Sequence, residues 1–244
     1  MALFGAPDVG FVLLGGRSLA GYLTEIADGQ EIVLKETHGL GDTADQWAVV
    51  GTNGQVMSNV KLTAIYNSTD LITAVDVATT QELMYNLQGN TINEDFVGID
   101  GVKGTVVRNG QKEEFHTVEI DFKAENAMDK GVVLAHLTAR DDTFVATTTV
   151  DNSASSANGA VGYLGVSALT LGGYTNIIVK IRDSTDDISY ADHITFAAVT
   201  AAPASERLTS TGTVNRYAHV TITWTGAGSG ETCTFAVGMR RNHF

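Results

Sequence analysis

The densest group of reactive side chains lies in Lys180–Tyr190, KIRDSTDDISY, which carries Asp183, Asp186 and Asp187. Carboxylates gathered in a loop are ligands that Ca²⁺ prefers, so one interpretation of this stretch is a cation site. The spacing D-x-x-D-D, however, lacks the alternating ligands and the central glycine of an EF-hand loop. The two carboxylates of a glycosidase must face each other across a cleft, which a single turn cannot provide.

A second interpretation is a bend between two strands, Ile177–Arg182 and Ile194–Val199. In such a bend, aspartate and serine side chains form hydrogen bonds with nearby backbone groups and stabilise the turn. A third interpretation is a contact with another subunit through Arg182 and the aspartates. The missing ligand spacing favours the turn, and the cation site and the subunit contact remain open alternatives.

Other signatures of catalysis are missing from the sequence or lack their context. Gly39–Ala44 fits G-x-G-x-x-A, but Trp47–Val50 and an Asn-Gly turn follow it instead of the crossover helix of a dinucleotide site. The sequence has no G-x-S-x-G, H-E-x-x-H or G-x-x-x-x-G-K motif. The sequence therefore predicts no enzyme, no cofactor and no metal, unless residues distant in sequence meet in space. The histidines are scattered: His38, His116, His136, His193, His219 and His243.

Composition indicates a folded protein rich in turns. The 244 residues are 43% hydrophobic and 18% charged, and they include 26 glycines but only 2 prolines. The net charge of −13 repels phosphate, which argues against tight binding of nucleic acid. The single Cys233 excludes an intramolecular disulfide, and the apolar run Phe11–Leu14 is too short to cross a membrane.

Apolar residues that alternate with polar ones predict strands with one buried face. In Phe115–Phe122, Val118 and Ile120 face one way, whereas Glu119 and Asp121 face the other. Similar alternation occurs in Asn176–Arg182 and in His219–Trp224. These segments predict that strands dominate the chain.

One segment departs from the alternation. Thr79–Glu82 fits a helix capping box, and Leu83 and Leu87 then fall on one helical face. Gly89 can end such a helix. We therefore predict a short α-helix over Thr80–Gln88.

Three Asx-Gly pairs predict hairpin turns: Asp28-Gly29, Asn53-Gly54 and Asn109-Gly110. The last is the strongest, because it joins two strand-like runs. The predicted fold is mainly β: an antiparallel β-sandwich or barrel with one short α-helix. We predict one domain over residues 1–244, with a subdivision near residue 125 as the alternative.

Five stretches resemble the tail tube (major tail) proteins of long-tailed, non-contractile bacteriophages. They are structural motifs spread over most of the chain, and they carry no catalytic signature. The stretches are Phe11–Leu23, Thr37–Trp47, Val179–Asp186, Gly212–Tyr217 and Thr234–Arg240.

The resemblance implies a β domain of the tail tube type that self-assembles into rings, which are hexameric in that family and are stacked into a hollow tube. It implies a virion tail protein that is made in the host cytoplasm and contacts no membrane. The implied partners are other copies of the chain and the tape measure, tail terminator and baseplate or tip proteins. Double-stranded DNA would pass through the lumen without tight binding, because carboxylates repel its backbone.

On this resemblance, particular residues acquire expected roles. Glu119 and Asp121 are expected to face the lumen. Trp47 is the favoured anchor between subunits, because aromatic side chains concentrate binding energy at interfaces. The full set of expected contact residues is Leu40, Asp42, Trp47, Arg182, Asp183, Asp186, Arg240, Arg241 and Phe244.

Two other classes of protein remain open. A carbohydrate-binding β-sandwich would hold Ca²⁺ in the Lys180–Tyr190 stretch and stack a sugar on Trp224 or Tyr190. Another virion component, such as a capsid decoration or tail terminator protein, would form isolated rings or trimers.

Overall fold

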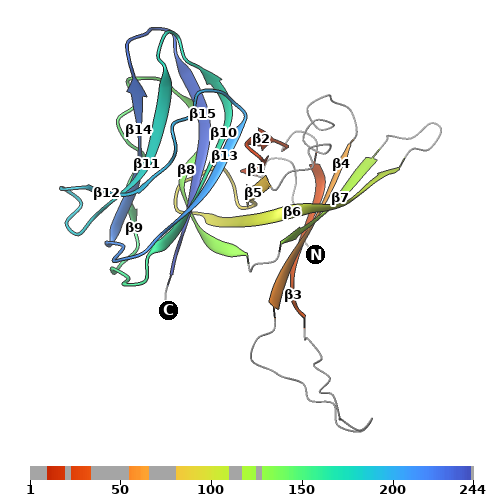
Figure 1. The fold of residues 1–244 in the computed structure, drawn as a ribbon. Coiled ribbons are helices and arrows are strands. Elements are labelled where there is room, and N and C mark those ends of the chain that lie inside the picture. The colour runs from red at the N-terminus through yellow and green to blue at the C-terminus, as the bar shows by residue number, and fades with distance from the viewer. Residues whose placement is uncertain are drawn as a thin grey trace, which may run out of the picture.

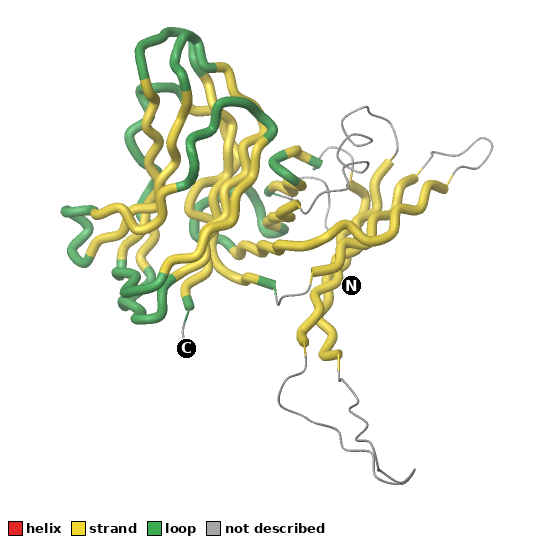
Figure 2. Tube along the Cα trace, viewed as in Figure 1, coloured by secondary structure: helices red, strands yellow, loops and turns green. Residues whose placement is uncertain are grey.

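The computed structural model describes residues 10–19, 23–33, 55–65, 81–109, 117–124 and 128–242. Every regular element in this part of the chain is a β-strand (Figures 1 and 2). The predicted antiparallel, mainly β fold is therefore confirmed. The strands are β1 (Phe11–Leu14), β2 (Arg17–Ser18), β3 (Leu23–Val33), β4 (Gln55–Ile65), β5 (Gln81–Asn86), β6 (Asp95–Asn109), β7 (Thr117–Ala124), β8 (Asp129–Arg140), β9 (Val150–Asp151), β10 (Ala160–Thr170), β11 (Asn176–Ser184), β12 (Ala191–Thr195), β13 (Ala204–Ser210), β14 (Tyr217–Thr225) and β15 (Thr232–Arg241).

The strands form two sheets. The larger has 11 strands: its main path is β13-β10-β15-β8-β6-β5-β1-β2, and β3, β4 and β7 continue it from β6. The smaller has 4 strands in the order β12-β11-β14-β9. Strand β6 belongs to both regions of the large sheet, since its first half pairs with β5 and β8 and its second half pairs with β7. Figure 1 shows β6 running from the sandwich to the β3-β4-β7 region.

Buried apolar side chains form three clusters, and their burial is the main stabilising contribution to such a fold. The sandwich core lies between the small sheet and strands β8, β10 and β15. The N-terminal core lies against β1, β4, β5 and β7. The junction core contains residues from both halves of the chain: Phe11, Leu13, Met84, Phe96, Val133, Val161, Tyr163 and Ala236.

The predicted alternation is correct in the strands where it was strongest. In β7, Val118 and Ile120 are buried, and Glu119 and Asp121 are half-buried on the opposite face. The inward residues of β11 are buried in the same way. In β14 the alternation is incomplete, because His219 is also buried.

The predicted helix over Thr80–Gln88 is wrong. Residues Gln81–Asn86 form β5, which pairs with both β1 and β6. Leu83 belongs to the N-terminal core and Met84 to the junction core, so both faces of the strand are buried. These long-range contacts outweigh the local capping signal, as tertiary packing commonly does.

Two of the three predicted tight turns are also wrong. Asp28-Gly29 lies inside β3, paired with β4. Strands β6 and β7 are antiparallel neighbours as predicted, but Asn109 pairs with Thr117, a register that a two-residue turn at Asn109-Gly110 cannot produce. Asn53-Gly54 lies outside the described residues.

Cys233 is a free thiol buried in the sandwich core. Its burial raises the pKa of the thiol to about 12, so it remains protonated at neutral pH and acts as a small apolar residue. Within the described ranges, no helix is long and apolar enough to span a membrane.

Candidate functional site

The polar face of the β3-β4-β7 region carries the two acidic residues that the sequence singled out. Lys61 of β4 forms an ion pair with Glu119 of β7, with 2.7 Å between Nζ and Oε2. The hydrogen bond and the charge of Glu119 raise the pKa of Lys61, and Asp121 and Glu25 contribute to the same effect. Three carboxylates thus act on one amine, and among the described side chains around Lys61 the negative charges are in excess.

The Lys180–Tyr190 stretch is a hairpin turn, as predicted. Strand β11 ends at Ser184, and β12 pairs back with it from Ala191. Asp186 Oδ1 accepts hydrogen bonds from the backbone N–H groups of Ile188 and Ser189, at 3.0 and 2.9 Å. Ser184 Oγ also donates to Asp186 Oδ1, at 2.8 Å. These donors lower the pKa of Asp186 to about 2, so the turn carries a fixed negative charge at neutral pH.

The aspartates of this turn do not converge on one point. Asp183 is buried, and its Oδ2 accepts a hydrogen bond from the backbone N–H of Asn215 at 2.8 Å. Asp187 instead accepts a hydrogen bond from the hydroxyl of Tyr190. In the part of the chain that the structure describes, no three His, Cys, Asp or Glu side chains are grouped to hold a metal ion.

Arg182 also has partners within its own hairpin. Its guanidinium donates to the carbonyl oxygen of Tyr190 and lies 3.0 Å from Asp192 Oδ1. Lys180 contacts the other oxygen of Asp192 at 2.6 Å. About a third of the Arg182 side chain, 34%, is still exposed and can meet another molecule.

Three polar residues that no sequence motif connects form a row: Asp183, His193 and Ser210. His193 Nδ1 lies 3.4 Å from Asp183 Oδ2, and His193 Nε2 lies 2.7 Å from Ser210 Oγ. The order resembles a hydrolase triad. However, Ser210 Oγ already accepts the N–H of Ala160 at 3.0 Å and lies 3.3 Å from its carbonyl oxygen. The row therefore connects β12 to β13 across the two sheets, and the backbone of Ala160 in β10 also engages the serine hydroxyl.

A second buried polar group, the Asp129 cluster, joins β8, β10, β13 and β15. Asp129 accepts hydrogen bonds from the hydroxyl of Tyr163 at 2.6 Å and from Arg207 Nη2 at 3.0 Å. Its other oxygen lies 2.7 Å from Arg240 Nη1. Arg240, an expected subunit contact, therefore has an intramolecular partner.

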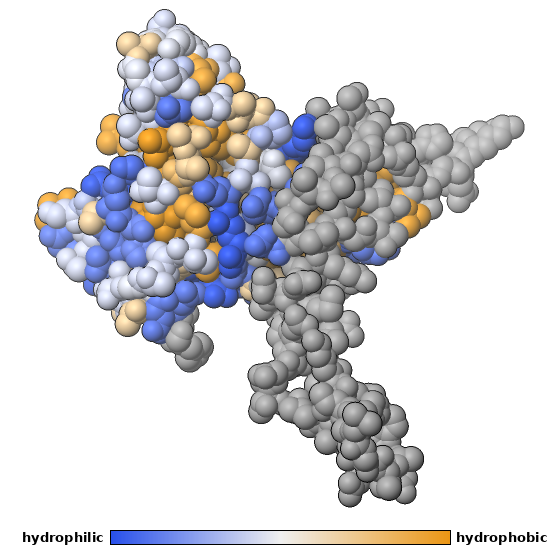
Figure 3. All heavy atoms as spheres, in the orientation of Figure 1, coloured by the Kyte–Doolittle hydropathy of each residue, from blue (hydrophilic) through white to orange (hydrophobic). Residues whose placement is uncertain are grey.

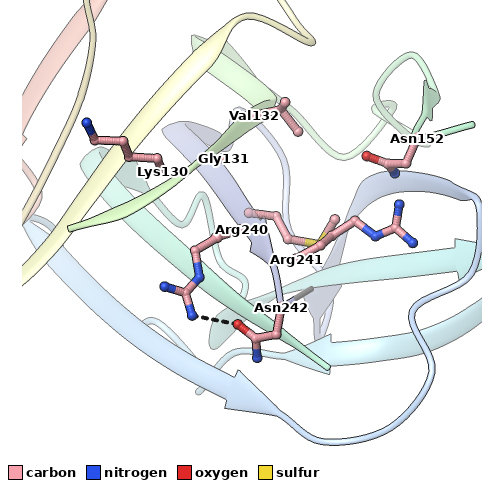
Figure 4. Close-up of a pocket in the computed structure, with 8 residues that line it drawn as sticks. Lys130, Gly131, Val132, Asn152, Arg240, Arg241 and Asn242 are labelled. Carbon is pink, nitrogen blue, oxygen red and sulfur yellow. Dashed lines mark hydrogen bonds between the residues drawn. The ribbon is translucent and has the colours of Figure 1, made fainter. Parts of the chain in front are cut away.

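An open pocket of about 600 Å³ lies beside the Asp129 cluster (Figure 4). Lys130, Arg240 and Arg241 bring three cations to it, and Val132 and Met239 form its apolar wall. This concentration of positive charge is unusual in a chain with a net charge of −13.

The counter-charges of the pocket are incomplete. Arg240 Nη2 donates to Asn242 Oδ1 at 2.6 Å, in addition to its pairing with Asp129. Arg241 Nη2 donates to the carbonyl oxygen of Ala154 at 2.6 Å rather than to a carboxylate. Lys130 is exposed, and no carboxylate of the described residues lies within ion-pair distance of it.

The aromatic residues considered for sugar binding are engaged within the chain. Tyr190 stacks on His219, with 3.8 Å between ring centroids. Trp224 packs against Tyr174 at 5.4 Å and donates its N–H to the carbonyl oxygen of Asp141. Both rings therefore have partners within the chain. The expected contact residues Leu40, Asp42, Trp47 and Phe244 lie outside the described residues.

The Asp186 turn has a testable pH dependence. Because the folded state lowers the pKa of Asp186 to about 2, the turn contributes stability above the ordinary carboxyl pKa, near 4, and loses it as pH falls towards 2. We expect Asp186→Asn to lose less free energy of unfolding than the natural chain between pH 4 and pH 2, measured by urea unfolding. Asp100→Asn on β6 is the control; equal acid sensitivity of D186N and the natural chain would contradict the assignment.

Comparisons with known proteins give loose similarities only. No family model and no curated protein matches the chain. A chain of the virion of a native gene transfer agent particle has 10% identity and a TM-score of 0.38, over 50% of this chain and 95% of that one. A chain from the tail of an empty gene transfer agent particle with C6 symmetry has 9% identity and a TM-score of 0.33, over 44% and 80%. The Dit protein of phage SPP1, described as a paradigm of the hub adsorption apparatus in phages infecting Gram-positive bacteria, has 11% identity and a TM-score of 0.32, over 95% and 99%. These structures come from virion, tail and hub assemblies, and such low scores assign no function.

Proposed function

We propose that the chain is a virion structural protein, the major tail tube subunit of a long, non-contractile phage tail. The observation that carries the proposal is the two-faced β3-β4-β7 region. Val60, Leu62 and Ile120 are buried on one face of this region, and Glu119 and Asp121 lie on the other face. A sheet that lines a water-filled lumen needs this arrangement, with its apolar side against the protein and its polar side towards water.

Strand β3, at the edge of this region, gives neighbouring copies a way to join into a ring. Strand β3 is 11 residues long, and among the described strands it pairs with β4 only. A long edge strand presents unpaired backbone groups to another chain. Joining β3 of one copy to the next copy would close the sheets into a ring, hexameric as in the tail tube family, and would remove the exposed edges. The stacked rings form the tube.

The acidic excess of the polar face suits passage of DNA. Among the described side chains of this face, Glu25, Glu119 and Asp121 outnumber Lys61, and such a lumen would repel the phosphate backbone. Double-stranded DNA would then slide during ejection without being held by counter-ion release. On this account the protein needs no cofactor and catalyses no reaction.

The remaining expectations complete the proposal. Leu40, Asp42, Trp47 and Phe244 stay candidates for contacts between subunits. The tape measure, tail terminator and baseplate or tip proteins are the proposed partners in the tail, after synthesis in the host cytoplasm. We further propose that residues 1–244 act as one domain, because the junction core packs side chains from both halves together.

Assembly in solution tests the proposal. Sedimentation velocity over rising protein concentration should show the single subunit giving way to large, discrete species, because every ring has the same number of copies. The carbohydrate-binding alternative predicts a stable single subunit that releases heat on addition of Ca²⁺. A chain that stays a single subunit at every concentration would contradict the proposed function.

A further inference from the structure

The pocket beside the Asp129 cluster has the properties of a receptor for an acidic segment. Its rim holds Lys130 and Arg241, which have no carboxylate partner within ion-pair distance among the described residues. This local positive charge is opposite in sign to the net charge of the chain, which is −13. An incoming carboxylate would gain charge-assisted hydrogen bonds there.

The pocket is not polar throughout. Val132 is half-buried, Met239 is almost fully buried, and together they provide an apolar wall beneath the cationic rim. Asn152 and Asn242 add amide groups at the sides (Figure 4). The fitting occupant therefore combines one apolar side chain with flanking negative charge.

The turn between β11 and β12 has this combination. Ile188 at its tip is 82% exposed, one of the most exposed large apolar residues of the described chain. Asp186 and Asp187 precede it, and both are exposed. The turn projects from the side of the sandwich in Figure 1, and hydrophilic residues gather over this half of the sandwich in Figure 3.

The turn is also held in one shape before any contact forms. Ser184 accepts the N–H groups of Asp186 and Asp187 at 3.2 and 3.1 Å, and Asp186 accepts those of Ile188 and Ser189. A preorganised segment loses little conformational entropy on binding.

We propose that the pocket of one copy receives the β11–β12 turn of a second copy of this chain. Ile188 lies against Val132 and Met239, and the carboxylates of the turn meet Lys130 and Arg241. Turn and pocket are different surfaces of the same subunit, so the contact is head-to-tail and repeats from copy to copy. The inference rests on the self-assembly of the proposed function and names one of its contacts.

Two exposed substitutions test the contact from its two sides. We expect Ile188→Asp and Lys130→Glu each to raise the protein concentration needed for half-assembly by about tenfold or more. Val145→Asp is the matched control, because Val145 is 81% exposed and lies on neither surface. Thermal unfolding of each variant shows that the subunit itself stays folded.

Two further experiments distinguish this contact from a general loss of solubility. Ser189→Lys combined with Lys130→Glu places a cation on the turn for the new carboxylate of the pocket, and it should restore part of the assembly that Lys130→Glu alone loses. The I188D chain keeps an intact pocket and the K130E chain keeps an intact turn, so an equal mixture should associate at lower concentration than either chain alone.

The outcomes separate the two proposals. If the natural chain assembles and I188D and K130E assemble equally well, the turn-in-pocket contact is overturned while the proposed function stands. The contact is also overturned if the mixture assembles no better than either variant alone, or if Ser189→Lys restores none of the assembly that Lys130→Glu loses. A natural chain that never assembles contradicts both.

Discussion

Replacing Asp129 by alanine is expected to lower the free energy of unfolding by about 3–5 kcal/mol. The carboxylate is 3% exposed and is the shared partner of Tyr163, Arg207 and Arg240. Burial, followed by the charge of Asp129, raises the pKa of Tyr163, so its hydroxyl remains a donor. Without Asp129, two guanidinium groups lose their counter-ion next to the core. Urea unfolding at neutral pH measures the loss.

Asp151→Ala is the matched control for this prediction. Asp151 also pairs with an arginine, Arg216, at 2.6 Å, but the two side chains are 44% and 43% exposed. Water screens such a surface pair, so its removal should change stability far less. If D129A were as stable as D151A, then water would hydrate the Arg207 and Arg240 guanidinium groups with no loss of stability. The structural role proposed for the Asp129 cluster would then be wrong.

Phe96→Ala is expected to cost about 3–5 kcal/mol of unfolding free energy. Phe96 is fully buried in the junction core, with its ring centroid 5.4 Å from that of Tyr163. Gly238 lies directly against it: a Cβ at that position would stand 2.3 Å from Phe96 Cδ2. The surroundings are therefore fitted to the ring, and truncation leaves a cavity that they fill poorly.

The same variant tests whether the two halves form one domain. Chemical unfolding followed by fluorescence and by circular dichroism should show one coincident transition for the natural chain and for F96A, shifted to lower denaturant in the variant. Phe144→Ala, at a half-buried position of the sandwich, is the control for loss of a phenyl ring. Two separate transitions in the natural chain would favour instead a division near residue 125.

Local pattern predicted the strands that bury only one face. Strands β7 and β11 have one apolar and one polar face, so their period of two is visible in the sequence. The turn after β11 was also predictable, because Asp and Ser side chains stabilise bends through hydrogen bonds with nearby backbone groups. Strand β5 was not, because both of its faces are buried by different cores and no alternation remains.

The polar groups inside the sandwich could not be predicted in the same way. Asp183, His193 and Ser210 lie on three strands, and only the pairing of β11 with β12 and the packing of β12 against β13 bring them together. Asp129 and Arg240 likewise meet only because β8 and β15 are neighbours. The sequence contains many polar residues that could pair in this way, and only the order of the strands determines which of them lie close together.

Electron microscopy of the concentrated protein tests the central claim most directly. We expect long hollow tubes with a regular axial repeat and an open lumen, built from this chain alone. Single subunits that persist at every concentration, with neither rings nor tubes, would contradict it.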